Sequence, residues 1–110
     1  MTTENEILLH RVCLSAKRAL SGQTPATLRA YSFAIDRDRK IVRLRAHFAE
    51  SPSDDALDLI SVVDTEIFSD FPDLFETETE IQVSPAGTPP SFLSGGIAYL
   101  REGEPGTCCS

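Results

Sequence analysis

The residues from 75 to 83 alternate strictly between two kinds of side chain, and this alternation constrains the fold more than any other feature of the sequence. Phe, Thr, Thr, Ile and Val occupy one set of positions, and Glu, Glu, Glu and Gln occupy the set between them. Successive side chains of a β-strand point to opposite faces, so the pattern predicts a strand with one buried face and one acidic face. The chain is therefore expected to build a sheet that is covered on one side only.

Two further strands are predicted at residues 28–35 and 41–49, on either side of a polar turn. Side-chain parity decides their register, because a shift of one residue moves every apolar side chain to the other face. Only one register collects the large apolar side chains on a single face. It pairs Tyr31 with Ala46, Phe33 with Leu44 and Ile35 with Val42, and it leaves Arg43, Arg45 and His47 on the opposite face.

Two segments have helical periodicity. Residues 4–20 form the first, which Gly22 ends, and the second begins after the capping residues 51–55 and continues to about residue 70. Asp64 falls inside the apolar arc of the second helix. It is interpreted as an acid at the edge of the buried stripe, as one hydrogen-bonded to a neighbour such as a strand arginine, or as a functional group. The predicted arc consists of Leu57, Ile60, Val63, Ile67, Phe68 and Phe71.

The order of elements predicts an α+β fold with two layers, α-β-β-α-β-β. Its four-stranded, mainly antiparallel sheet carries both helices on one face. Residues 84–96, rich in Pro and Gly, are expected to form a long loop before a last strand. Residues 1–101 are expected to form one domain and residues 102–110 a flexible tail. The three basic residues of the outer face then share the open side of the sheet with Glu76, Glu78 and Glu80, as an ion-pair ladder or as separate patches.

Charge is divided unevenly along the 110 residues. The formal net charge is −7, but residues 1–49 carry +5, whereas residues 50–110 carry −12 with Arg101 as their single basic side chain. A strongly negative surface repels nucleic acid and membranes and attracts basic proteins, although such a charge can also serve solubility alone. If a protein partner binds here, the predicted contact residues are Asp70, Asp73, Glu76, Glu78 and Glu80.

No catalytic or metal-binding motif is evident. The two histidines have no neighbouring nucleophile, and no Gly-rich phosphate loop is present. Glu76, Glu78 and Glu80 could supply paired carboxylates or ligands for a hard metal, but a solvated strand face is the commoner explanation. Cys13, Cys108 and Cys109 lack the spacing of a zinc site, and their odd number leaves at least one unpaired. We therefore expect no enzyme activity, no metal and no cofactor.

The sequence contains no apolar run of the length a membrane span requires and no signal-peptide pattern at its start, so a cytoplasmic protein is expected. A set of positions spread from the first helix to the end of the second forms a recognisable pattern: Ala19-Leu20-Ser21-Gly22, Pro25, Leu28-Arg29-Ala30, Phe33, Ile41, Leu44, His47-Phe48, Pro52, Asp55, Ile60-Ser61, Thr65-Glu66-Ile67 and Asp70-Phe71-Pro72. With these residues the sequence resembles a family of small bacterial proteins that includes immunity proteins of contact-dependent growth inhibition and related polymorphic toxin systems.

The resemblance implies a cytosolic antidote that binds and blocks one cognate toxin domain. It transfers no binding residue, because the matching positions are mostly core, turn and helix-end residues. Combined with the charge, it predicts a basic toxin domain as partner, a nuclease being one candidate. The alternative is a small non-enzymatic structural or regulatory subunit whose open sheet face is a homodimer or partner interface.

Overall fold

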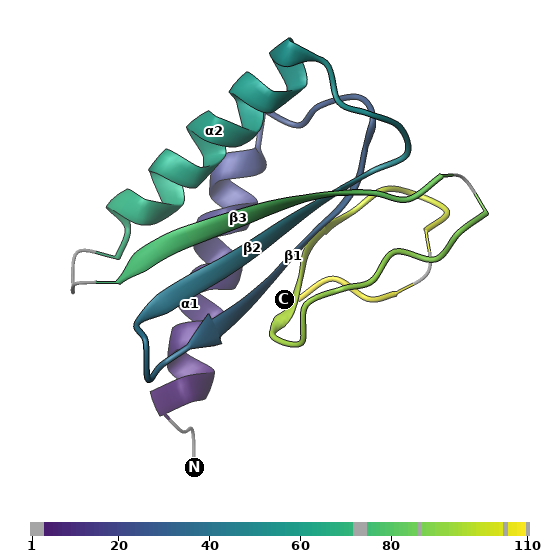
Figure 1. Ribbon diagram of the computed structural model, residues 1–110. Helices are drawn as coiled ribbons and strands as arrows, with labels where there is room; N and C mark the ends of the chain where they lie inside the picture. The colour runs from purple at the N-terminus through teal and green to yellow at the C-terminus, as the bar shows by residue number, and fades with distance from the viewer. Residues whose placement is uncertain (1–3, 72–74, 86, 105, 110) are drawn as a thin grey trace.

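The computed structural model describes residues 4–71, 75–85, 87–104 and 106–109, and in these residues it contains two helices and four strands. Their order, α-β-β-α-β-β, is the predicted one (Figure 1). The elements are α1 (Glu4–Leu20), β1 (Leu28–Asp36), β2 (Ile41–Phe48), α2 (Asp54–Ser69), β3 (Glu76–Val83) and β4 (Gly96–Leu100).

The four strands form one mixed sheet in the order β3-β2-β1-β4. β1 is antiparallel to both β2 and β4, and β2 is parallel to β3. The parallel pair arises because α2 carries the chain from the end of β2 back to its beginning before β3 starts. Two antiparallel pairings and one parallel pairing confirm the predicted α+β fold with a mainly antiparallel sheet.

The predicted hairpin register is confirmed. Tyr31 pairs with Ala46, and Phe33 with Leu44, as parity requires. These four side chains are at most 1% exposed, so the register places every one of them in the core. The turn uses a left-handed backbone at Lys40, where φ is 55°.

The core lies between the sheet and the two helices, which cover the same face (Figure 1). α1 contributes Val12 and Ala16, α2 contributes Ile60 and Ile67, and the strands contribute the largest buried side chains. Burying one such aliphatic or aromatic side chain stabilises the fold by about 1.5–3 kcal/mol. This shared core fixes the sheet so that its other face points away from both helices.

The predicted apolar arc of α2 is too broad. Leu57 and Phe68 are 39% and 49% exposed, whereas Ala56 takes a buried position instead. The buried stripe is centred on Val63 and Ile67, and Leu57 and Phe68 lie about a quarter turn away from it. They therefore form an apolar margin along one side of α2.

The prediction that His47 lies on an open sheet face is also wrong, because His47 is completely buried. Residues 84, 85 and 87–95 form the predicted loop, and part of it lies over the outer face of β1 and β2. The Phe92 ring packs edge-on against the His47 imidazole at a centroid distance of 5.1 Å, and the Leu93 amide donates to Ser32 Oγ at 3.1 Å. Only the part of the outer face nearer β3 remains open.

The chain after β4 returns to the domain. Cys109 forms a disulfide with Cys13 of α1, and its amide donates to the carbonyl of Ile97 in β4 at 2.7 Å. The sequence left this pairing open, and Cys108 is exposed and unpaired. The boundary at residue 101 and the flexibility of the following tail stay predictions.

Candidate partner-binding surface

The parallel register of β2 and β3 builds an ion-pair ladder on the open part of the outer face. Arg43 lies opposite Glu78, and Arg45 lies opposite Glu80. Arg43 Nη2 is 3.3 Å from Glu78 Oε1, and Arg45 Nη2 is 2.6 Å from Glu80 Oε1. Of the two arrangements predicted for these charges, the ladder is confirmed.

The glutamates of the ladder remain accessible. The side chains of Glu78 and Glu80 are 55% and 59% exposed, whereas that of Arg45 is only 18% exposed. Arg45 has a second partner in the loop that follows β3, because its Nη1 donates to the carbonyl of Ser91 at 2.7 Å. The surface that a partner meets is therefore more acidic than the balanced pairing suggests. Exposed pairs of this kind contribute only about 0–1 kcal/mol to stability.

A hollow of about 410 Å³ lies beside this ladder. Its walls are the ladder itself and Leu93 of the loop. It is polar and open to solvent, which suits recognition of a polar side chain better than enclosure of a small molecule.

Asp70, a predicted contact residue, faces α1 instead of β3. Ser15 Oγ donates to its carboxylate at 2.5 Å, Arg18 forms an ion pair with the same oxygen, and Arg11 donates to its backbone carbonyl. The hydroxyl of Ser15 and then the guanidinium of Arg18 hold the pKa of Asp70 below its ordinary value. Its carboxylate thus stabilises the packing of α1 against the end of α2.

The remaining predicted contact residues are placed as follows. Glu76 is exposed at the start of β3, and its amide donates to the carbonyl of Lys40 at 2.9 Å. Asp73 lies outside the described residues. The structure therefore brings Glu76, Glu78 and Glu80 to one face and does not place the Asp70 carboxylate among them.

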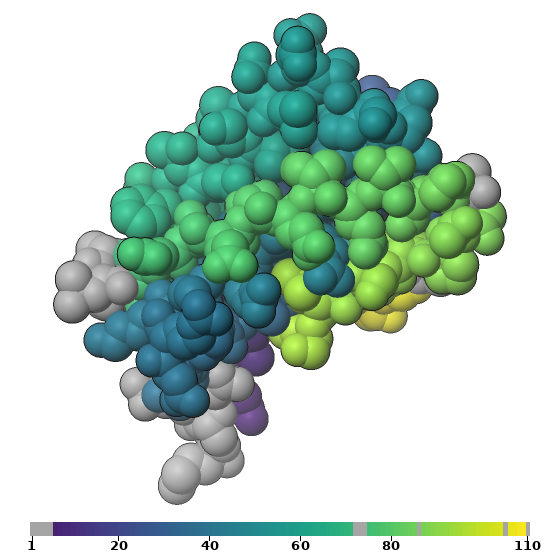
Figure 2. Space-filling model, in the orientation of Figure 1, coloured from purple at the N-terminus to yellow at the C-terminus, as the bar shows by residue number. Residues whose placement is uncertain are grey.

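Exposed acids of α2 add to the negative charge of the molecule and were not predicted as part of the surface. Asp54, Asp55, Asp58 and Glu66 of α2 are all exposed, and the sequence has no Lys or Arg between residues 46 and 100. Figure 2 shows α2 (teal) and β3 (green) side by side on the visible face. A narrower helical arc would have revealed Asp54 and Asp58, because it places them opposite Val63. Glu66 lies on the side of α2 towards α1, where Gln23 donates to its carboxylate at 3.2 Å.

Asp64 joins α2 to the sheet. The Tyr31 phenol donates to Asp64 Oδ1 at 2.8 Å, and Thr79 of β3 makes a second hydrogen bond to the same carboxylate. Burial raises the pKa of Asp64, against the effect of both hydrogen bonds, and burial also raises the pKa of Tyr31 well above its ordinary value. The expectation of a hydrogen-bonded acid is confirmed, with a tyrosine as donor in place of an arginine.

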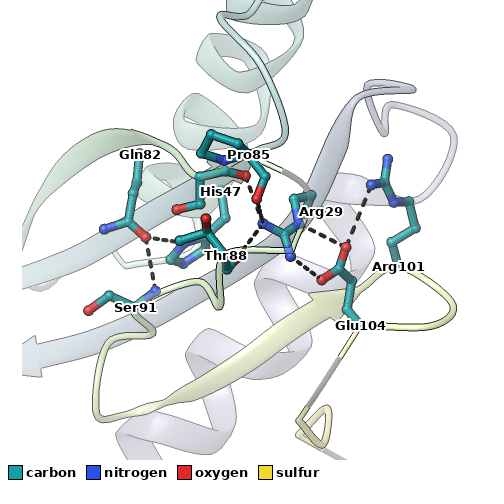
Figure 3. Close-up of polar contacts among 9 residues, drawn as sticks. Arg29, His47, Gln82, Pro85, Thr88, Ser91, Arg101 and Glu104 are labelled. Atoms are coloured by element: carbon teal, nitrogen blue, oxygen red, sulfur yellow. Dashed lines mark hydrogen bonds and ion pairs between the residues drawn. The ribbon is translucent and has the colours of Figure 1, made fainter.

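Arg29 anchors the loop and the tail together. Its Nη1 donates to the carbonyls of Ser84 and Thr88 at 2.7 and 2.9 Å, while Nε and Nη2 make a bidentate pair with Glu104 at 2.8 and 2.6 Å (Figure 3). Arg29 is only 4% exposed. These bonds satisfy a buried guanidinium and hold the loop against the outer face.

Ser32, His47 and Gln82 form a hydrogen-bonded chain whose order resembles nucleophile, base and orienting group. Ser32 Oγ is 2.8 Å from His47 Nε2, and His47 Nδ1 is 2.8 Å from Gln82 Oε1. Ser32 and His47 are fully buried, and Gln82 Oε1 also accepts from the Ser91 amide at 3.0 Å (Figure 3). Burial lowers the pKa of His47. The chain holds the loop in place and offers a substrate no access to the hydroxyl.

No group of three His, Cys, Asp or Glu side chains that could hold a metal occurs among the described residues. Within the same part of the chain, neither helix is long and apolar enough to cross a membrane.

The fold and this surface define a small α+β protein with an accessible acidic strand at one edge of its sheet. The family model of the MafI2 immunity protein matches residues 10–103, and the chain therefore belongs to the MafI2 immunity protein family. This membership gives the protein an immunity, or antitoxin, role and implies a cognate toxin as its partner. A comparison with curated proteins finds no match.

Proposed function

We propose that this protein is a cytoplasmic, non-enzymatic immunity protein that binds a basic toxin domain through the acidic face of β3 and blocks it. A nuclease is the toxin chemistry that fits best, because a channel that binds nucleic acid is basic. The observation that carries the proposal is the exposure of Glu76, Glu78 and Glu80 along one strand, in the half of the chain whose single basic side chain is Arg101.

The test is a titration of the purified protein against the toxin domain encoded by the adjacent gene. The variant carries Glu76→Gln, Glu78→Gln and Glu80→Gln, which removes three charges without setting new cations against Arg43 and Arg45. We expect its affinity to fall roughly tenfold to a hundredfold, mainly through slower association, and the salt dependence of association to weaken.

The matched control carries Glu50→Gln, Asp58→Asn and Glu102→Gln. These three acids are also exposed but lie outside β3, so the net charge changes equally. Equal losses of affinity in the two triple variants would show that binding depends on the net charge of the protein and not on the β3 acids in particular. An unchanged affinity in the β3 variant would move the interface to another surface.

The alternative function is a structural or regulatory subunit that uses the same region to form a homodimer. The exposed apolar side chains Leu57 and Phe68, which lie on the side of α2 along β3, favour it. Sedimentation across a wide concentration range separates the two functions, because a dimer through this region would mask the surface proposed for the toxin.

The cytoplasmic location is tested by the cysteines. Disulfides persist in oxidising compartments, whereas cytoplasmic thiols are kept reduced. Because Cys13 is buried in the fold, the cells are quenched in acid and the thiols are labelled after denaturation. Labelling is then expected to modify Cys13 and Cys109 as well as Cys108 if the protein is cytoplasmic. Labelling of Cys108 alone would place it in an oxidising compartment.

A further inference from the structure

β3 is an edge strand, and among the described residues no other strand pairs with its second side. It lies at the end of the sheet order β3-β2-β1-β4, and its neighbour β2 pairs with it along its whole length. The opposite edge, β4, is partly covered. The Cys109 amide donates to the carbonyl of Ile97, and the disulfide with Cys13 holds Cys109 beside β4. Figure 2 shows β3 (green) as a continuous band at the surface.

The direction of the β3 backbone groups follows from its two ends. The amide of Glu76 donates to Lys40 of the turn before β2, and the amide of Ser84 donates to Phe48 at the end of β2. Alternate residues of a strand direct their N–H and C=O to the same side. The even-numbered residues of β3 therefore pair with β2, and Thr77, Thr79, Ile81 and Val83 present their backbone groups at the open side.

The two faces beside this open side differ in chemistry. On the outer face, Glu78 and Glu80 already accept arginines from β2 and keep more than half of their side-chain surface exposed. A strand added on the other side of β3 would set its own outer residues opposite the same glutamates. Lys or Arg at those positions would complete a ladder of alternating charge.

The inner face offers apolar surface. Leu57 and Phe68 share one stripe of α2 with Asp64, which is hydrogen-bonded to Thr79 of β3. This contact places the stripe along β3, and Leu57 and Phe68 remain 39% and 49% exposed. The inner residues of an added strand would cover both side chains. Val83, 45% exposed, would extend the contact along β3.

A second copy of this chain fits the edge poorly. If two β3 strands paired, the outer face of one would place its glutamates opposite those of the other, and like charges directly opposite each other are destabilising. Charged side chains on an edge strand are a known protection against self-pairing. The edge therefore disfavours its own copy and favours a strand of opposite charge.

We propose that the toxin domain adds a β-strand to the open side of β3, and that this strand alternates between Lys or Arg and apolar residues. The proposal rests on the proposed function and specifies how the partner is held. Backbone hydrogen bonds would supply affinity, and the alternating side chains would supply specificity.

The test compares Thr79→Pro with Thr79→Ala in titrations against the toxin domain encoded by the adjacent gene. Both variants lose the hydroxyl bond to Asp64, but only proline removes the outward N–H, which β2 does not use. We expect Thr79→Pro to bind at least roughly tenfold more weakly than Thr79→Ala, because one hydrogen bond is lost and its neighbours are disturbed. Circular dichroism checks both folds, and Thr77→Pro against Thr77→Ala repeats the comparison nearer the strand start.

Amide hydrogen exchange gives a second readout on the unmodified protein. The amides of Thr77, Thr79, Ile81 and Val83 should exchange fast in the free protein and become protected in the complex. Binding without this protection, and with equal affinity of the Pro and Ala variants, would overturn the edge proposal and leave the proposed function intact. Protection of these amides in the free protein that increases with protein concentration would show that a second copy of the chain pairs with the edge.

A peptide probe tests the edge without the toxin. A short synthetic peptide that alternates Lys and Val should shift the amide resonances of the same four residues, and a peptide that alternates Glu and Val should not. Equal shifts with both peptides would contradict the charge argument. Failure of the adjacent gene's toxin domain to bind, together with a response to the Lys and Val peptide, would reject the proposed function but not the edge chemistry.

Discussion

At the scale of single residues, Asp64 shows how one polar side chain can bond to the buried core and also lie beside exposed apolar side chains. It accepts the Tyr31 phenol beneath the helix and lies between the exposed side chains of Leu57 and Phe68 on the same stripe. An acid in an apolar arc is destabilised by burial unless a donor reaches it. Here a fully buried tyrosine supplies that donor, so the pair joins α2 to β1.

We expect Asp64→Asn to be tolerated better than Asp64→Leu. Asparagine keeps an oxygen for the Tyr31 hydroxyl, whereas leucine leaves that buried donor unpaired at a cost of about 1–3 kcal/mol. Thermal melts of both variants at neutral pH measure the difference. Equal stability of the two would show that the Tyr31 bond contributes little.

At the scale of elements, the bidentate pair of Arg29 with Glu104 connects β1 to the chain beyond β4. The hydrogen bond from Arg29 is the main cause that holds the pKa of Glu104 below its ordinary value of 4.5. A carboxyl with a lowered pKa in the fold contributes stability above its ordinary pKa and loses it as the pH falls through the lowered value. The pair should therefore stabilise the protein at neutral pH and cease to do so in acid.

The expected result for Glu104→Gln is a loss of roughly 1.5–3 kcal/mol at pH 7, because a nearly buried guanidinium loses its charged partner. The loss should shrink as the pH falls below about 4.5 and vanish once wild-type Glu104 is protonated. Urea unfolding of wild type and variant from pH 2.5 to pH 7 measures it.

Two features keep that comparison clear. The raised pKa of Asp64 changes stability with pH in the opposite direction, because its stabilisation is present at low pH and lost as the pH rises through the raised value. This contribution is the same in wild type and Glu104→Gln, so it cancels in the comparison. Glu102→Gln, an exposed neighbour in the same tail, serves as the matched control. A difference between wild type and Glu104→Gln that does not change with pH would contradict the electrostatic explanation.

Much of the fold could be predicted from local pattern. Parity alone was sufficient for the pairing of Tyr31 with Ala46, and alternation was sufficient for the acidic face of Glu76, Glu78 and Glu80. The covering of His47 was not predictable, because it depends on backbone carbonyls of a distant loop that bond to Arg29 and leave no periodic signal. Asp70 was assigned to the wrong neighbours for a similar reason, since its partners Ser15 and Arg18 lie on α1.

At the scale of the whole molecule, the disulfide joins residues that are 96 positions apart. Two adjacent cysteines near the end of the chain left the choice of partner open in the sequence. A crosslink across so long a segment restricts the unfolded chain strongly, and native disulfides of this kind contribute about 2–4 kcal/mol.

Cys13→Ser is expected to lower the free energy of unfolding by about that amount under oxidising conditions, and a reducing agent should lower wild type equally. Cys108→Ser is the matched control, because the exposed Cys108 is unpaired, and it should leave stability unchanged. Wild type that melts identically with and without reductant would show that the crosslink does not stabilise the fold.

The link between Cys13 and Cys109 also closes most of the chain into a covalent circle. The irregular loop formed by residues 84, 85 and 87–95 lies within that circle, so a single proteolytic cut there would open the circle without releasing either piece. The fragment that carries β3 and the fragment that carries β4 would remain one molecule until the disulfide is reduced. A nicked protein could thus keep the strand proposed to hold its partner attached to the rest of the sheet.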